Sequence, residues 1–314
     1  MMKRPIILFF SICLFACIGM SQTGDVNQVL KAGFDKIASQ EYAQAIKEFN
    51  RALRMQPGLA EAYKGRAEAK YYLSQYDEAF KDINKSLEIN SNYAEAYLVR
   101  GMLFQAQKQS ADALKDFDKA LAINPSLYEA LIQKAIVLYQ NDKEKEAFEI
   151  LNNAISKDPN QAALYYGRGI LYNNKQKFEK ALADFNKSIE LNADYNPFYL
   201  YLARGTAYLG IKEYEQALND FSKAIQMVPK SAIAYSSRAK VYYETEKYNE
   251  AIADYEKTIE LNPDNAAAYF NQGMAYFKID DKRSACERFH KACSMGNNNA
   301  CKMILINCME ERKK

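Results

Sequence analysis

Four cysteines near the C-terminal end are the residues whose spacing most directly suggests chemistry. They are separated by seven, eight and seven residues, and the single histidine of the chain lies among them: Cys286, Cys293, Cys301 and Cys308, with His290. Thiols can form disulfides, bind zinc or fill a hydrophobic core. Seven residues along one helix span about 10.5 Å, which is too far for a disulfide. A bridge between these cysteines therefore requires two helices.

A turn at residues 296–299 would fold this segment into an antiparallel hairpin. Cys293 would then lie opposite Cys301 and Cys286 opposite Cys308, so the spacing predicts two nested disulfides. Packing of reduced thiols in the core is the alternative. A zinc site is disfavoured because the close ligand spacing of structural zinc sites is absent. We predict neither a metal nor a cofactor.

Five arginines that each lie sixteen residues before an aspartate form a second pattern with chemical content. The pairs are Arg66–Asp82, Arg100–Asp116, Arg168–Asp184, Arg204–Asp220 and Arg238–Asp254. A guanidinium can donate two parallel hydrogen bonds to one carboxylate. We predict five structural ion pairs, each joining two helices. Duplication of one ancestral segment without energetic coupling would leave the same pattern, and a double-mutant cycle separates the two interpretations.

The rest of the chain offers little for catalysis or for nucleic-acid binding. Its 314 residues include one histidine and no tryptophan, and they contain no nucleophile elbow and no glycine-rich phosphate loop. We therefore predict no catalytic residues and no enzymatic activity. The 42 basic and 39 acidic residues are mixed along the chain, so no basic stripe is present to neutralise phosphates.

These residues lie within a repeated frame. Alanines recur every 34 residues, with one interval of 36, at Ala45, Ala79, Ala113, Ala147, Ala181, Ala217, Ala251 and Ala285. A small residue precedes each by twelve positions, and a large apolar residue follows each by four. Apolar spacings of three and four predict helices, and prolines after the second apolar stretch of five copies predict helix ends. Each copy is expected to be two antiparallel helices in which the small residue faces the alanine.

The columns resemble the tetratricopeptide repeat family, whose W-x2-L-G-x2-Y, A-x3-F and P pattern has the same period. Tyrosines replace the leading tryptophan in six copies, at Tyr63, Tyr97, Tyr165, Tyr201, Tyr235 and Tyr269. The resemblance implies an all-α fold, a right-handed alpha-alpha superhelix (TPR solenoid) of eight helical hairpins plus a C-terminal capping helix. The expected hairpins are residues 26–59, 60–93, 94–127, 128–161, 162–197, 198–231, 232–265 and 266–299, and the cap with its charged tail is 300–314. The two extra residues at 193–197 are expected to form a loop, with a hinge as the alternative.

In this family the first helices of the hairpins line a concave groove that holds peptides or partner proteins. Carried onto this sequence, the resemblance implies an apolar groove rich in tyrosine. Its residues would be Phe34, Tyr71, Met102, Ile132, Ile136, Tyr139, Tyr166, Ile170, Tyr199, Leu202, Tyr243, Phe270, Met274 and Phe277. Tyrosine gives a large contact area and a hydroxyl group at low entropic cost, which suits binding hot spots. Some of these side chains would instead pack against neighbouring copies.

The N-terminal segment resembles a secretory signal. Lys3 and Arg4 precede an apolar run, and small residues precede a cut that would leave Gln22 first. We therefore expect a signal peptide at residues 1–21, a short tail at 22–25, and a secreted, periplasmic or envelope-associated protein. In the competing interpretation, Cys17 is lipidated in an imperfect lipobox. The apolar run is too short to span a bilayer, so we predict no membrane span.

The stretch from Lys291 to Cys301 resembles the Sel1-like repeats of exported bacterial proteins, in which cysteines bridge paired helices. Together these patterns predict a non-enzymatic scaffold that binds another protein or peptide in the cell envelope. A purely structural spacer is the first alternative, and an enzyme or carbohydrate-active protein built on a helical solenoid is the second. The sequence names neither the partner nor the oligomeric state.

Overall fold

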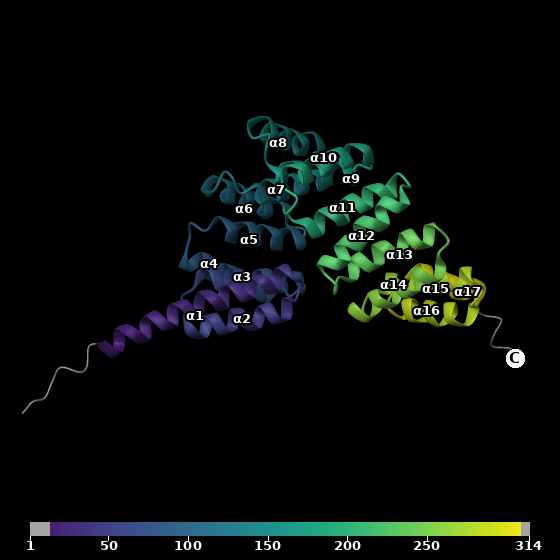
Figure 1. The fold of residues 1–314 in the computed structure, drawn as a ribbon, viewed down its shortest axis with the longest axis horizontal. Coiled ribbons are helices and arrows are strands. Elements are labelled where there is room, and N and C mark those ends of the chain that lie inside the picture. The colour runs from purple at the N-terminus through teal and green to yellow at the C-terminus, as the bar shows by residue number, and fades with distance from the viewer. Residues whose placement is uncertain (1–12, 309–314) are drawn as a thin grey trace, which may run out of the picture. The chain divides into compact units, whose positions relative to one another are not determined.

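The computed structural model describes the backbone of residues 13–308 (Figure 1) and the side chains of residues 26–308. Within that range all regular structure is helical, and no strand is present. The predicted signal segment lies largely outside the described backbone, and Cys17 and Gln22 lie outside the described side chains. None of the helices in the described range is both long enough and apolar enough to cross a membrane.

Within residues 13–308 eight helical hairpins follow one another, and a seventeenth helix follows the last of them. The first helices of the hairpins are α1 (Cys13–Ala38), α3 (Ala60–Tyr72), α5 (Ala94–Ala106), α7 (Tyr128–Gln140), α9 (Ala162–Asn174), α11 (Pro197–Gly210), α13 (Ala232–Glu244) and α15 (Ala266–Lys278). The second helices are α2 (Tyr42–Met55), α4 (Tyr76–Ile89), α6 (Ser110–Ile123), α8 (Glu144–Lys157), α10 (Phe178–Leu191), α12 (Tyr214–Met227), α14 (Tyr248–Leu261) and α16 (Lys282–Ser294). The last helix is α17 (Asn298–Asn307).

The helices form two compact units, whose described parts are residues 13–147 and 148–308. In the first unit α2 packs between α1 and α3, and the same arrangement continues through α7. In the second unit the order runs from α9 and α10 to α16 and α17. A single hairpin cannot bury its own apolar face, so each unit is a stack in which one hairpin covers the next.

The small-residue column makes room for an aromatic ring in the same hairpin. A Cβ atom added to Gly205 would lie 2.8 Å from the ring of Phe221, and one added to Gly33 would lie 2.7 Å from the ring of Phe49. Both rings are fully buried. The small residue is predicted to face the alanine, and a Cβ atom added to Gly273 would lie 3.2 Å from the carbonyl oxygen of Ala285. The structure adds that the ring four positions after the alanine reaches across the helix crossing to the same glycine.

Each hairpin turn is closed by one residue in the left-handed backbone region. These residues are Gln40, Ser74, Lys108, Asp142, Gln176, Lys212, Glu246 and Asp280, with φ between 56° and 63°. In one such turn the amide of Gln75 donates to the carbonyl of Lys70, and the amide of Ser74 donates to that of Tyr71. These bonds satisfy carbonyl groups at the helix end. The repeated turn keeps the two helices of every hairpin in the same geometry.

The two extra residues of the long interval lie in the loop between α10 and α11. Asn196 in this loop has a φ of 47°, and Pro197 begins α11. Proline is favoured at that position because it needs no amide partner there and its φ matches the helix. The insertion therefore lies in the loop and at the start of α11, which has 14 residues where α9 and α13 have 13.

Candidate functional site

The five predicted Arg–Asp pairs lie within hydrogen-bond distance in the structure. In each pair Nε donates to one carboxylate oxygen and Nη2 donates to the other, as between Arg100 and Asp116 at 2.7 and 2.9 Å. The other four pairs have the same arrangement at 2.5 to 2.9 Å. The aspartates are buried, whereas the arginines are half-buried. Each pair joins the two helices of one hairpin.

The same guanidinium groups also contact the preceding hairpin, which the sequence analysis did not predict. Nη1 of Arg100 donates to Oδ1 of Asn84 at 3.2 Å, and Nη1 of Arg238 donates to Oγ of Ser222 at 3.1 Å. Arg66, Arg168 and Arg204 bind asparagines at 2.6 to 2.8 Å, namely Asn50, Asn152 and Asn186. Each arginine therefore links three helices of two neighbouring hairpins.

Two hairpins without an Arg–Asp pair balance their charges in another way. Lys134 occupies the arginine position, and its Nζ lies 2.7 Å from Asp118 of the preceding hairpin, where the hairpins that precede an arginine have asparagine or serine. Gln272 donates to Glu256 at 2.7 Å, and Arg288 lies 3.2 Å from the same carboxylate. In both cases the acidic residue lies in the preceding hairpin instead of in the same hairpin. We therefore interpret the residues at the arginine position as structural contacts between hairpins.

The predicted groove residues of the first unit lie on its first helices and are largely covered. Phe34, Tyr71, Met102, Ile136 and Tyr139 are half-buried. The ring of Phe34 packs at 5.1 Å from the ring of Phe49, and the Lys64 ammonium lies 4.4 Å above it. A sixth predicted residue, Ile132, is only 4% exposed, so it belongs to the core of the stack.

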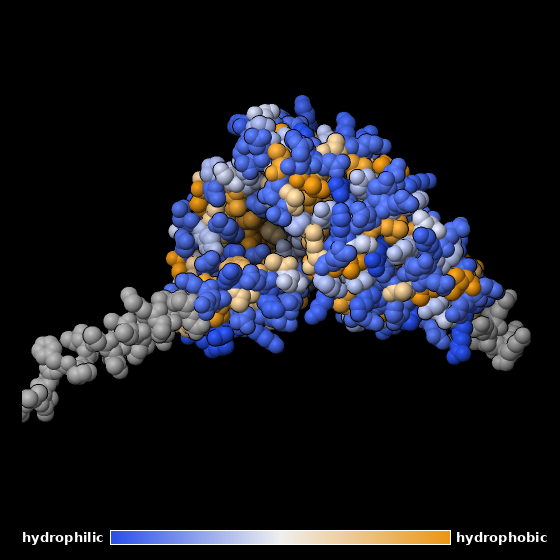
Figure 2. Space-filling model, in the orientation of Figure 1, coloured by the Kyte–Doolittle hydropathy of each residue, from blue (hydrophilic) through white to orange (hydrophobic). Residues whose placement is uncertain are grey.

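The predicted residues of the second unit are more varied in exposure. Tyr199 is 36% exposed, whereas Leu202 is 8% exposed and packs in the core beside Phe221. The remaining predicted residues are half-buried: Tyr166, Ile170, Tyr243, Phe270, Met274 and Phe277. Hydrophilic residues cover most of the face shown in Figure 2, and hydrophobic residues lie in separate patches on it.

Two open pockets lie side by side on the first helices of the second unit. The larger one, of about 380 Å³, lies between α13 and α15 and contains three predicted residues, Tyr243, Phe270 and Met274. Its other lining residues are Lys240, Glu244, Tyr255 and Asn271. The smaller one, of about 280 Å³, is lined by Phe178, Thr206, Leu209, Gly210, Lys212, Tyr214, Lys240 and Glu244. Lys240 and Glu244 of α13 line both, so the two pockets form one trough on either side of that helix.

Two tyrosine hydroxyls of the trough lie in surroundings that disfavour their ionised form. Burial raises the pKa of the Tyr255 and Tyr243 hydroxyls above the ordinary value, and the nearby tyrosines and Glu244 raise it further. Both hydroxyls therefore stay protonated at neutral pH and can donate hydrogen bonds. Within residues 26–308 neither Lys240 nor Glu244 takes part in an ion pair. The trough thus offers aromatic walls and unpaired charged groups to a ligand.

Sequence reasoning missed the wall that Phe178 gives to the smaller pocket. A Cβ atom at Gly210 would lie 2.6 Å from the Phe178 ring, so only glycine lets this ring rest on the end of α11. The matching residue of the next hairpin is Glu244, and the one after that is Lys278. A glycine at position 210, where the next two copies have charged residues, was the signal that could have identified this position.

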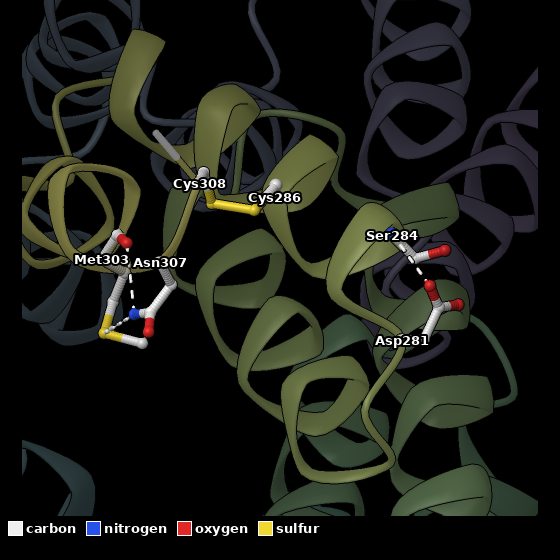
Figure 3. Close-up of a disulfide and its surroundings, with 6 residues drawn as sticks. All are labelled: Asp281, Ser284, Cys286, Met303, Asn307 and Cys308. Carbon is white, nitrogen blue, oxygen red and sulfur yellow. Dashed lines mark hydrogen bonds between the residues drawn. A yellow bond between two sulfur atoms is a disulfide. The ribbon is translucent and has the colours of Figure 1, made fainter. Parts of the chain in front are cut away.

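The four cysteines form two pairs that join α17 and the residue after it to α16, and Figure 3 shows one of them, Cys286–Cys308. Cys286 is bonded to Cys308 with a Cα–Cα distance of 5.8 Å, and Cys293 is bonded to Cys301 with a Cα–Cα distance of 4.9 Å. Ala300 and the half-buried side chains of α17 cover the core around Phe289. Asn297 caps α17 by accepting a hydrogen bond from the Ala300 amide. The cap therefore covers the apolar end of the second unit.

Comparison with known proteins identifies the repeats. Models described as tetratricopeptide repeat match residues 30–95, 94–127, 162–195 and 267–294, and a model described as TPR repeat matches residues 205–246 and 239–280. No curated protein sequence matches the chain.

Several solved structures share the fold. Cut9 in the APC/C hetero-tetramer with Hcn1 has a TM-score of 0.66 at 16% identity, covering 91% of this chain and 56% of that chain. Yeast Tom70 has a TM-score of 0.61 at 21% identity, covering 89% of this chain and 57% of that chain. A tetratricopeptide repeat protein from Parabacteroides merdae has a TM-score of 0.53 at 16% identity, covering 80% of this chain and 98% of that chain.

The chain thus spans little more than half the length of Cut9 and Tom70. At these identities the likeness concerns the fold alone. The matched models and the repeated hairpins agree on the repeat type across both units. The chain belongs to the tetratricopeptide repeat family.

Proposed function

We propose that this protein is a non-enzymatic scaffold that binds another protein or a peptide through the first helices of its hairpins. Tetratricopeptide repeats bind proteins and peptides, and Cut9 is found in a complex with Hcn1. The observation that carries the proposal is the trough on α13, where aromatic side chains surround the unpaired Lys240 and Glu244. Aromatic residues beside polar groups are typical of binding hot spots.

We further propose that the protein acts outside the cytoplasm, in the cell envelope. The basic and then apolar N-terminal segment supports export. The two cysteine pairs at bonding distance support an oxidising compartment, where disulfides persist. Mass spectrometry of the mature protein distinguishes a free N-terminus at Gln22 from a lipidated Cys17. An unprocessed N-terminus and reduced thiols in the native protein would contradict export.

The interaction itself can be tested by site-specific photocrosslinking in native cells. A photoreactive residue at Asn271, which lines the larger pocket, should give adducts with a partner protein. The same residue at Lys230, which is exposed and lines neither pocket, is the matched control. Adducts at Asn271 should disappear when Tyr243→Ala is added. Equal labelling at both positions, or none at either, would favour a structural spacer over a binding scaffold.

A further inference from the structure

The exposed side of α17 has a composition that indicates what it contacts. It is formed by Asn298, Asn299, Lys302, Leu305 and Ile306. We propose that this side binds the surface of a lipid bilayer with anionic headgroups, where the two aliphatic side chains enter the interface and the ammonium group binds the headgroups. This inference goes beyond the proposed function, because it concerns the cap and not the trough on α13.

The exposed and the covered residues of α17 lie on opposite sides of the helix. At ~100° per residue, the five exposed residues fall within an arc of about 120°. Ala300, Met303 and Ile304 lie outside that arc and pack in the core around Phe289. The exposed side is therefore a defined face of the helix and not a set of scattered positions.

The C-terminal half of this face consists of two aliphatic residues. Leu305 is 66% exposed and Ile306 is 74% exposed, more than any other large hydrophobic residue between 26 and 308. The cap of a repeat stack normally has a polar outer face, which keeps the end of the stack soluble. The disulfides of Cys301 and Cys308 hold the opposite side of α17 to α16, so the helix cannot turn to bury the pair. An exposed apolar pair on a fixed helix indicates a contact surface.

The charges around the apolar pair have one sign. The sequence contains no acidic residue from Arg288 to Cys308. Lys302 lies three and four residues before Leu305 and Ile306, so it shares their face. It forms no ion pair with any residue between 26 and 308. The partner must therefore accept aliphatic side chains and carry negative charge.

The length of the apolar stretch favours a bilayer over a partner helix or a second copy. A docked helix uses apolar anchors over about two turns, whereas the exposed side of α17 offers one turn, because Asn298 and Asn299 occupy its other half. A second copy would bring another Lys302 to the contact and no acidic residue of α17 to pair with it.

A bilayer with anionic lipids meets both requirements. Aliphatic side chains of a helix that lies on the surface enter the boundary between headgroups and acyl chains. Basic side chains beside them bind the anionic headgroups. The stem of a lysine can lie along the apolar surface while its ammonium group reaches the headgroups. This arrangement needs only the short apolar stretch and the single cation that α17 presents.

Fluorescence of an introduced tryptophan tests the contact on the full chain, because the sequence contains no tryptophan. The test variant is Ile306→Trp, and the matched control is Ile233→Trp, since Ile233 is 58% exposed on α13. With vesicles of phosphatidylglycerol and phosphatidylcholine, we expect the emission of Ile306→Trp to shift to shorter wavelength. Brominated phosphatidylcholine should quench it. Ile233→Trp should show neither change. Quenching at both positions, or at neither, would overturn the proposal.

Further changes in the Ile306→Trp chain test the two parts of the contact. Lys302→Ala should raise the lipid concentration for half-maximal quenching about fivefold, and Leu305→Ser should raise it about tenfold. Both residues are exposed, so neither change disturbs the core. Lys230→Ala, at an exposed position outside the cap, should have no effect.

The lipid composition and the protein concentration separate the remaining outcomes. Equal insertion into pure phosphatidylcholine would overturn the assignment of anionic headgroups. An emission shift that grows with protein concentration, and that vesicles do not change, would identify a second copy as the occupant and overturn the proposal. If the cap does not enter vesicles while Asn271 still crosslinks a partner, the scaffold function stands and only the membrane contact is wrong.

Discussion

Removal of one partner of the Arg100–Asp116 pair should destabilise the first unit far more than its exposed surface suggests. The Asp116 side chain is 7% exposed and accepts both hydrogen bonds from Arg100, whose side chain is 25% exposed. The hydrogen bond with Asp116 raises the pKa of the Arg100 guanidinium above its ordinary value, so this group stays charged. Arg100→Met would leave a buried carboxylate without its cation, which costs about 3–5 kcal/mol.

The coupling between the two side chains is the quantity to measure. In a double-mutant cycle with Arg100→Met and Asp116→Leu, we expect a coupling of ~1–3 kcal/mol, because the contact is bidentate and largely removed from water. The double variant should recover part of the loss, because two apolar side chains leave no buried charge. Asn84→Ala, which removes only the bond to the preceding hairpin, should cost about 1 kcal/mol.

Reversible urea unfolding followed by circular dichroism supplies the free energies, with a nearest-neighbour analysis because stacked repeats unfold in parts. The Lys134–Asp118 pair is the matched control, since its side chains are 23% and 59% exposed. Its coupling should be ~0–1 kcal/mol. Strict additivity at Arg100 and Asp116, or a coupling no larger than that of the control, would refute the interpretation and leave repeat duplication as the explanation.

Three further predictions follow from local geometry. Reduction of the Cys286–Cys308 bond, or Cys308→Ser, should lower the stability of the α16–α17 cap by about 3 kcal/mol, seen as faster amide exchange in α17 with α13 unaffected. Gly210→Ala should destabilise the second unit by about 1–3 kcal/mol because its Cβ meets the Phe178 ring, whereas Gly58→Ala, with open space around it, should be nearly neutral. Burial raises the pKa of Tyr166, so the stability that this residue contributes is complete below about pH 10 and declines above it as the unfolded chain ionises first. Tyr166→Phe should therefore show a smaller alkaline loss of stability, and an unchanged pH profile would contradict that account.

The hairpins could be predicted from the sequence because their signal is repeated in every copy. The small column and the aromatic column are visible without a structure, yet the direct contact between the ring and the glycine was not predicted. A one-dimensional pattern gives the face of a helix but not the reach of a side chain, and the Phe221 ring extends across the crossing to Gly205. The predicted groove residues show the same limit of sequence patterns. Ile132 and Leu202 occupy positions equivalent to those of half-buried neighbours, yet both are buried, and Leu202 packs in one core cluster with Phe221 and Val241.

The arrangement of charges explains why arginine and aspartate change together and also what replaces them. Each arginine position contacts two acceptors, one in its own hairpin and one in the preceding hairpin. Where its own hairpin supplies aspartate, the preceding hairpin supplies a neutral asparagine or serine, so each guanidinium contacts a single carboxylate. Where Ile150 stands in place of that aspartate, the acid is Asp118 of the preceding hairpin, paired with Lys134.

The unit that keeps its charge balance is therefore the junction between hairpins rather than the single hairpin. A substitution at an arginine position is tolerated when the acid moves with it along the stack, as Gln272, Glu256 and Arg288 show at the other end of the chain. It follows that hairpins of this chain cannot be exchanged freely. A hairpin moved next to one with the wrong acceptor would bring two carboxylates or two cations together at the junction, where like charges repel.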